Sequence, residues 1–200
     1  MHRLLAGVLV ALAFTGPARA EQAPAERDSA AAESNRRYGD LNVMLKGGIG
    51  SFTGGLNEFT SAGPSWGAVL NLQPTRVLGF EVAYEGSHHA MPGLGNAALL
   101  RNGGSAMLKL GPPLIDRYRP FVATGLGASF VRPQGADAAI AESDLMQEVP
   151  LVAGFEFNTR RVTAGVRASY RYLVDEQFLR PVGNPQGGMF DTSVTVGGRF

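Results

Sequence analysis

The stretch SWGAVLNLQPTRVLGFEVAYE, residues 65–85, decides how this chain folds. Within residues 65–73, and again within residues 77–85, every second side chain is apolar, and most of the side chains between are polar or small. A period of two is that of a β-strand with one apolar face, because successive side chains point to opposite sides. Pro74, Thr75 and Arg76 separate the two runs and favour a tight turn. The stretch therefore predicts a β-hairpin.

The same alternation recurs along the rest of the chain, from Gly39 to Phe200. It predicts an all-β chain of about eight strands, in which consecutive strands are antiparallel. The expected strands lie at residues 41–49, 65–73, 77–85, 104–110, 119–130, 148–157, 162–172 and 190–200.

The two faces of these strands differ in charge. The apolar face carries no Asp, Glu, Lys or Arg, whereas the opposite face mixes Gly, Ala and Ser with charges of both signs. A Lys or Arg facing lipid at mid-depth costs about 2–4 kcal/mol, which explains an uncharged outer face. We therefore expect a membrane barrel whose narrow interior holds ion pairs. The expected interior charges are Lys46, Glu81, Glu85, Lys109, Arg119, Glu148, Glu156, Arg167, Arg171, Asp191 and Arg199.

Partners for these charges follow from the assumption that each pairs with a charge on a neighbouring strand. A register error of one or two residues would change the assignment. The expected pairs are Glu81 and Glu85 with Lys109, Glu156 with Arg119, and Glu148 or Asp191 with Arg171.

A sheet in hydrocarbon cannot keep unpaired edges, so the first and last strands must pair and close a barrel. About eight strands leave an interior that side chains fill, so we expect no open pore. Connections near residues 54–64, 87–102, 132–145 and 173–188 are long, and those near 73–76, 112–117 and 158–161 are short, as outer loops and periplasmic turns are. Aromatic girdles are expected from Trp66, Tyr84, Phe130, Tyr170, Tyr172 and Phe190 near the outer ends of strands, and from Phe157 and Phe200 near the inner ends.

The first 38 residues lack this alternation. Residues 1–20 combine a positive start, a short apolar run and the sequence Ala18-Arg19-Ala20, which predicts a secretory signal peptide cut near Ala20. Its removal takes away Arg3 and Arg19, so the formal charge falls from +1 to −1, which gives no support to a nucleic-acid surface. Residues 21–38 are interpreted as a flexible periplasmic lead-in. No later apolar run approaches the roughly 20 residues of a membrane helix.

Two stretches carry a resemblance to a known family. The sequence PFVATGLG at residues 120–127, and the terminal strand that ends in Phe200, resemble the small outer-membrane β-barrel family, the OmpA/OmpX-like group. The resemblance covers about residues 39–200. It implies a closed antiparallel up-and-down transmembrane barrel in the bacterial outer membrane, surrounded by outer-membrane lipid and lipopolysaccharide. It also implies that Phe200 is a signal to the barrel assembly machinery.

Residues suited to catalysis are few. The chain has no cysteine, which excludes disulfides and thiolate metal sites. His88 and His89 follow Ser87, as in a lipid A-modifying hydrolase, but adjacent residues of an extended chain point to opposite sides and no carboxylate is placed to orient either histidine. We expect no catalytic residue, cofactor or metal, and a monomer. Three functions remain open: a non-enzymatic barrel that displays surface loops, a lipid A-modifying hydrolase, and a narrow pore or lateral conduit for small solutes.

Overall fold

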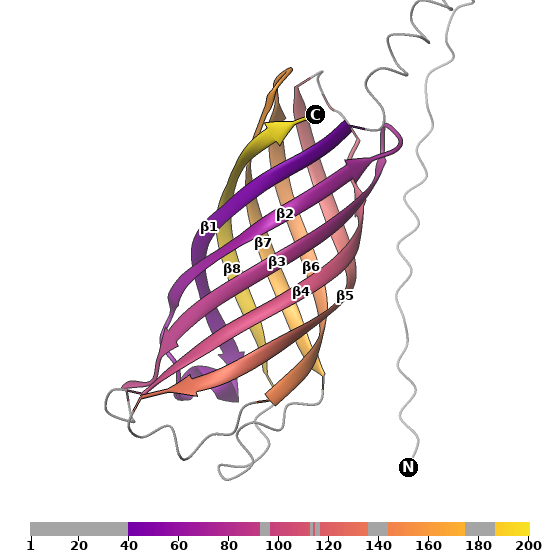
Figure 1. Cartoon of the computed structure of the whole chain (residues 1–200). Helices are drawn as coiled ribbons and strands as arrows, with labels where there is room; N and C mark the ends of the chain where they lie inside the picture. Colours follow the sequence, from indigo (N-terminus) through magenta and orange to yellow (C-terminus); the bar gives the residue numbers. More distant parts are fainter. Residues whose placement is uncertain (1–39, 93–96, 113, 115–116, 136–143, 175–186) are drawn as a thin grey trace, which may run out of the picture. The chain divides into compact units, whose positions relative to one another are not determined.

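The computed structural model describes residues 40–92, 97–112, 114, 117–135, 144–174 and 187–200, and there it is a closed β-barrel (Figure 1). Each strand is antiparallel to the next, as the alternation predicts. The expected signal peptide and lead-in lie outside the described residues. The strands are β1 (Asp40–Gly54), β2 (Gly63–Gln73), β3 (Leu78–Ala90), β4 (Ala98–Leu110), β5 (Tyr118–Gln134), β6 (Asp144–Asn158), β7 (Val162–Val174) and β8 (Gly187–Arg199).

The barrel closes between β1 and β8, which pair from Asn42 opposite Arg199 to Gly54 opposite Gly187. Beyond the last ladder pair, the Leu41 and Phe200 backbones exchange two hydrogen bonds of 3.2 and 2.9 Å. This closure leaves no sheet edge, which is the condition for a sheet that spans lipid.

Burial follows the predicted alternation. Leu45 and Leu126 on the outer face are 68% and 74% exposed, whereas Lys109 and Thr163 on the inner face are fully buried. Apolar side chains therefore dominate the outer face and the charged side chains of the strands lie inside, the reverse of the usual arrangement in a soluble protein. No described helix is long and apolar enough to span a membrane.

The two ends of the barrel differ. Turns of four and three residues follow β2 and β6, at residues 74–77 and 159–161, and a connection of seven residues, 111–117, follows β4; we call this the short-turn end. The connections after β1, β3, β5 and β7 have seven to twelve residues, and we call this the long-loop end. After β1 the chain forms the 3-10 helix η1 (Gly55–Glu58), which Gly54 makes possible by adopting a φ of 68°.

Strands run further into the long-loop end than the sequence predicts. β3 continues to Ala90 and β4 begins at Ala98, so the loop expected at residues 87–102 spans residues 91–97. The ladder between β5 and β6 skips Gly125 and Leu126, opposite Pro150 and Val149, because proline has no N–H to donate.

Candidate functional site

The interior of the barrel holds the chemically distinctive residues of this protein. Ten buried charged side chains form two series in which positive and negative groups alternate. The long-loop network consists of Arg101, Glu148, Arg171, Glu85, Lys46 and Asp191, in that order. The short-turn network consists of Arg167, Glu81, Lys109 and Glu156.

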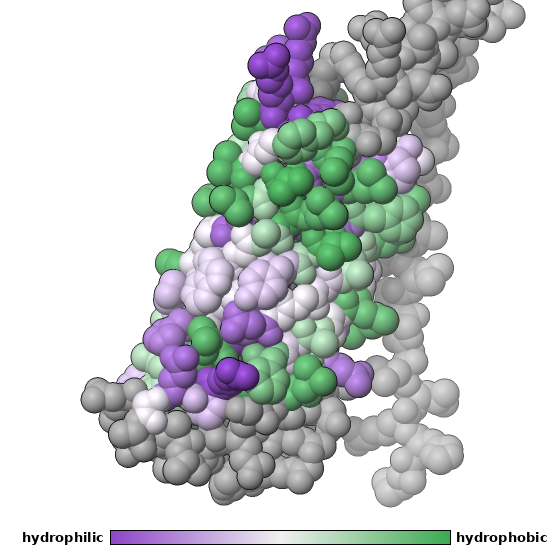
Figure 2. All heavy atoms as spheres, viewed as in Figure 1, coloured by the Kyte–Doolittle hydropathy of each residue, from purple (hydrophilic) through white to green (hydrophobic). Residues whose placement is uncertain are grey.

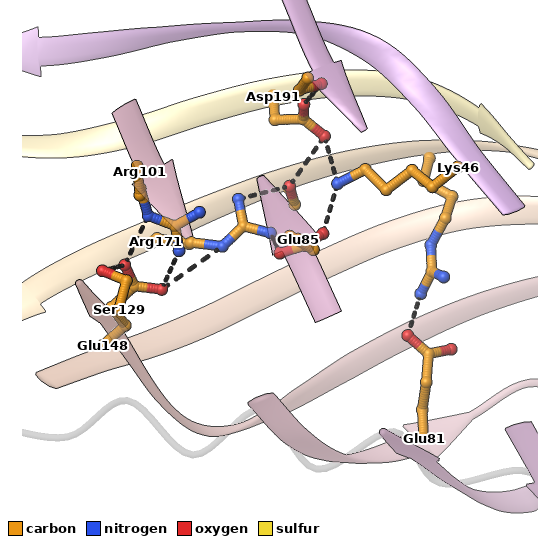
Figure 3. A network of polar contacts seen from close by, with 11 residues as sticks. Lys46, Glu81, Glu85, Arg101, Ser129, Glu148, Arg171 and Asp191 are labelled. Carbon is orange, nitrogen blue, oxygen red and sulfur yellow. Dashed lines mark hydrogen bonds and ion pairs between the residues drawn. The ribbon is translucent and has the colours of Figure 1, made fainter. Parts of the chain in front are cut away.

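In the long-loop network, Arg171 on β7 is the central cation (Figure 3). Its guanidinium bonds to Glu85 and lies 3.6 Å from the Glu148 carboxylate, which Arg101 also binds through a 2.9 Å bond from Nε. At the other end of the series, Lys46 bonds to Glu85 and lies 2.6 Å from Asp191. Each carboxylate except the terminal Asp191 thus has two cationic partners.

Serine hydroxyls complete the long-loop network. Ser129 donates to Glu148, and Ser65 donates to Asp191. Ser169 accepts a 3.3 Å bond from Arg171 and lies 3.5 Å from Asp191. The carboxylates are therefore solvated by protein groups, which a buried ion pair needs in order to offset its loss of water.

The short-turn network is smaller and uses an aromatic ring where the other uses hydroxyls. Arg167 bonds to Glu81, and Lys109 bonds to Glu156 and lies 3.9 Å from Glu81. Both cations lie over the ring of Phe121, with centroid distances of 4.1 Å for Lys109 and 5.1 Å for Arg167. The negative face of the ring stabilises the cations.

Both networks are electrically neutral. The long-loop network has three cations and three carboxylates, and the short-turn network has two of each. All ten residues are at most 9% exposed. Neutral networks carry no surplus fixed charge to attract an ion of either sign.

Buried apolar side chains form two clusters in the interior. One lies at the long-loop end around Phe52, Leu99 and Met146. The second includes Met44, Met107 and Phe121 and touches the short-turn network through that ring. Buried apolar groups therefore lie both across the barrel and at one of its mouths.

The outer wall is a band of apolar residues, and Figure 2 shows it as a green surface with strongly hydrophilic side chains beyond it at the short-turn end. Of the expected girdle residues, Tyr84 lies at the midpoint of β3, because that strand extends beyond its expected end. Trp66 lies near the long-loop end of β2 and its ring covers Gly86 on β3. The other expected outer aromatics lie in the long-loop half of their strands: Phe130, Tyr170, Tyr172 and Phe190.

Solved structures of bacterial outer-membrane proteins contain closed barrels of this kind. This is the fold of the small outer-membrane β-barrels. Neisserial surface protein A superposes with a TM-score of 0.62 at 10% identity, over 81% of this chain and 99% of that protein. Ail of Yersinia pestis, solved with the heparin analogue sucrose octasulfate, superposes with a TM-score of 0.58 at 11% identity, over 82% of this chain and 99% of Ail. OprG of Pseudomonas aeruginosa superposes with a TM-score of 0.57 at 11% identity, over 82% of this chain and 96% of OprG. No family model and no curated protein matches the sequence.

Within this small outer-membrane barrel fold, two of the expected ion pairs are present, Glu81 with Lys109 and Glu148 with Arg171. One expectation needs correction. Glu85 pairs with Lys46 and Arg171, which lie on β1 and β7, and not with Lys109. Glu156 has Arg119 as its neighbour in the β5–β6 ladder, and it also bonds to Lys109 on β4, a partner that the sequence did not predict. Most of the ion pairs join strands that are not neighbours in the sheet, whereas the expected pairs all joined neighbouring strands.

Arg101 was missed because it falls in the loop expected at residues 87–102. Arg101 lies an even number of positions before Ser105, Met107 and Lys109, and therefore on the same face of β4. Extending the alternation towards the start of β4 would have placed it inside. Two other expected interior residues, Arg119 and Arg199, lie half-buried near the short-turn ends of β5 and β8, and Arg119 is opposite Glu156 in the β5–β6 ladder.

The Ser87 and His89 side chains are buried on β3, and do not lie in the loop expected near residues 87–102. His89 Nδ1 lies 3.1 Å from the Ser61 carbonyl oxygen, and its ring packs edge-on against Phe52. His88, on the opposite face, is partly exposed. Within the described part of the chain, no group of three or more His, Asp or Glu is arranged to hold a metal. The arrangement gives the Ser–His sequence a packing role.

Proposed function

We propose that this protein spans the bacterial outer membrane as a non-enzymatic, closed barrel that displays the connections of its long-loop end for envelope structure or interaction. The observation that carries the proposal is the pair of neutral, buried networks inside an apolar wall. An apolar exterior suits lipid, and an interior filled by ion pairs and apolar clusters leaves the outer connections as the surface that can meet a partner.

Orientation follows from the connections. Short turns face the periplasm in barrels of this type, and longer loops face outwards. Asp40 and Phe200 both lie at the short-turn end, so the lead-in at residues 21–38 enters from the periplasm after cleavage near Ala20.

The surroundings of the barrel belong to the same proposal. Outer-membrane lipid and lipopolysaccharide contact the apolar wall, with Trp66, Tyr172 and Phe190 in the outer aromatic girdle and Phe157 in the inner one. Phe200, whose ring is 77% exposed, is the signal to the barrel assembly machinery. The protein acts as a monomer, without cofactor or nucleic acid.

Single-channel recording of the refolded protein in a planar bilayer, beside a heat-modifiability gel, tests this proposal. We expect a band that shifts on heating, as closed barrels give, and no stable conductance steps. Stable steps would show a continuous water path through the interior and would replace the proposal with a solute conduit. Absence of the heat shift would contradict the closed barrel itself.

A further inference from the structure

The three short turns share a feature that the interior does not use: each exposes arginine. Arg76 lies in the turn after β2, Arg117 in the connection after β4, and Arg160 and Arg161 in the turn after β6. All four side chains are exposed. These turns face the periplasm in the proposed orientation.

Two of the turns are built in the same way, from Thr75 to Leu78 and from Thr159 to Val162. In each, the threonine backbone N–H donates to the carbonyl of the residue three positions later, at 3.4 and 2.8 Å. The threonine Oγ1 accepts from the N–H of that same residue, at 2.9 Å in both turns. The threonine fixes the turn and leaves two residues at its tip.

The residues at these tips are unusual for hairpins. Two-residue hairpin loops favour Asn-Gly, Asp-Gly or Gly-containing pairs, because their backbone conformations suit those residues. Here the tips are Arg76-Val77 and Arg160-Arg161. Local turn propensity therefore does not explain the arginines, and their exposed charge is the property left to explain.

The arginines of the second and third turns lie on one arc of the rim. The Arg117 carbonyl accepts a 2.7 Å bond from Asn158, just before the β6–β7 turn. The Arg161 carbonyl accepts a 3.0 Å bond from Arg199 at the end of β8. The arc therefore runs continuously from Arg117 through Arg160 and Arg161 to Arg199.

An aromatic patch on the outer wall adjoins this arc. The Tyr118 ring lies 5.2 Å from Phe157 and 5.7 Å from Phe155, and Tyr118 directly follows Arg117. Aromatic rings mark the level where hydrocarbon gives way to headgroups. The arginines, one step further from the barrel centre, lie at headgroup level, where Figure 2 shows hydrophilic side chains above the green band.

The balance of charge at this end is positive. Outside the short-turn network, the sequence places six arginines here, Arg76, Arg117, Arg119, Arg160, Arg161 and Arg199, against the acids Asp40 and Asp116, of which Asp116 lies outside the described residues. A partner that fits this rim is anionic. The adjoining aromatic patch favours a lipid over a soluble polyanion, because a lipid can contact the patch and the arginines together.

We propose that the arginine rim binds the phosphate groups of anionic phospholipids in the leaflet at the short-turn end, and so fixes the depth of the barrel. The guanidinium fork matches phosphate in a bidentate way. Basic groups near an anionic leaflet strengthen binding by about fivefold each. This inference rests on the proposed membrane location and names the class of lipid that the arginine rim binds.

Native mass spectrometry of the refolded protein in detergent micelles, titrated with an equal mixture of phosphatidylglycerol and phosphatidylcholine, tests the rim. We expect retained lipid to be enriched in phosphatidylglycerol. R160Q/R161Q removes two basic groups and should reduce that enrichment by up to about twenty-five-fold. The control R132Q/R180Q removes the same charge from the last part of β5 and from the connection after β7, both remote from the short turns, and should keep the enrichment.

Equal loss in both double variants, or no loss in R160Q/R161Q, would overturn the lipid site. An enrichment that millimolar inorganic phosphate abolishes in the wild type would also overturn it, because the site would then be a general anion site. Insertion into pure phosphatidylcholine vesicles, followed by the heat-shifted band, reports separately on the proposed function. A barrel that inserts but shows no lipid preference therefore refutes the rim and leaves the membrane proposal intact.

Discussion

Both interior networks pair buried positive and negative side chains, but the uncharged groups around these charges differ. In the long-loop network, six charges alternate through Arg171 at the centre, and Ser65, Ser129 and Ser169 supply hydroxyls. In the short-turn network, four charges alternate, and the ring of Phe121 lies beneath both cations. The first network is polar throughout, whereas the second is joined to an apolar cluster. The comparison shows that neutrality is what the networks share, and that the groups around the charges differ.

The first way to break the comparison is Arg171→Met. The change removes the cation that joins Glu85 to Glu148, so two buried carboxylates lose a partner at once. We expect the free energy of unfolding to fall by about 3–5 kcal/mol. Urea unfolding of the protein refolded in lipid vesicles measures it. The control Arg132→Met removes an exposed arginine that lies over Phe130 and should cost less than about 1 kcal/mol; equal losses would show that Arg171 is not buried among charges.

The second is Lys109→Met in the short-turn network. Glu156 loses its close partner, but Glu81 keeps Arg167, so we expect a loss near the lower bound for buried pairs, about 3 kcal/mol. The double variant K109M/E156Q removes a cation and a carboxylate together and leaves the neutral pair Arg167–Glu81. It should unfold at higher urea concentration than K109M alone. A double variant less stable than the single one would contradict the alternating series.

The smallest effect sharpens the role of the hydroxyls. Ser129→Ala removes a donor to Glu148 while both cationic partners remain, so we expect a loss of about 1.5 kcal/mol in the same urea assay. Ser51→Ala, at a half-exposed hydroxyl bonded to its neighbour's carbonyl, is the matched control and should change stability by less than about 0.5 kcal/mol. If both changes have the same effect, the hydroxyl does not stabilise the network.

The sequence was sufficient for the strand faces because alternation is a property of each strand alone. Lys46, Glu81, Glu148 and Asp191 are buried as predicted, since one buried face fixes the parity of the whole strand. It was insufficient for strand ends where Gly86, Ser87 and His88 interrupt the run of apolar and β-branched residues, although β3 continues through them.

The ion-pair partners inside the barrel were harder to predict from the sequence than the strand faces. Arg101 with Glu148 and Lys109 with Glu156 both join β4 to β6, and Glu81 with Arg167 and Glu85 with Arg171 both join β3 to β7. These partners are not neighbours in the sheet. In a narrow barrel, long side chains reach the opposite wall, so the distance across the interior decides their partners, and that distance depends on strand tilt and register.

The link between Lys46 and Asp191 has a consequence for the order of assembly. These residues lie on β1 and β8, the strands that meet where the barrel closes, whereas Arg101 and Glu148 lie on strands separated by β5 alone. A partly built sheet can already join the second pair, but the first forms once the two chain-terminal strands come together. The Lys46–Asp191 ion pair therefore forms in the closed barrel and not in an open sheet, so it contributes to the stability of the closed barrel alone.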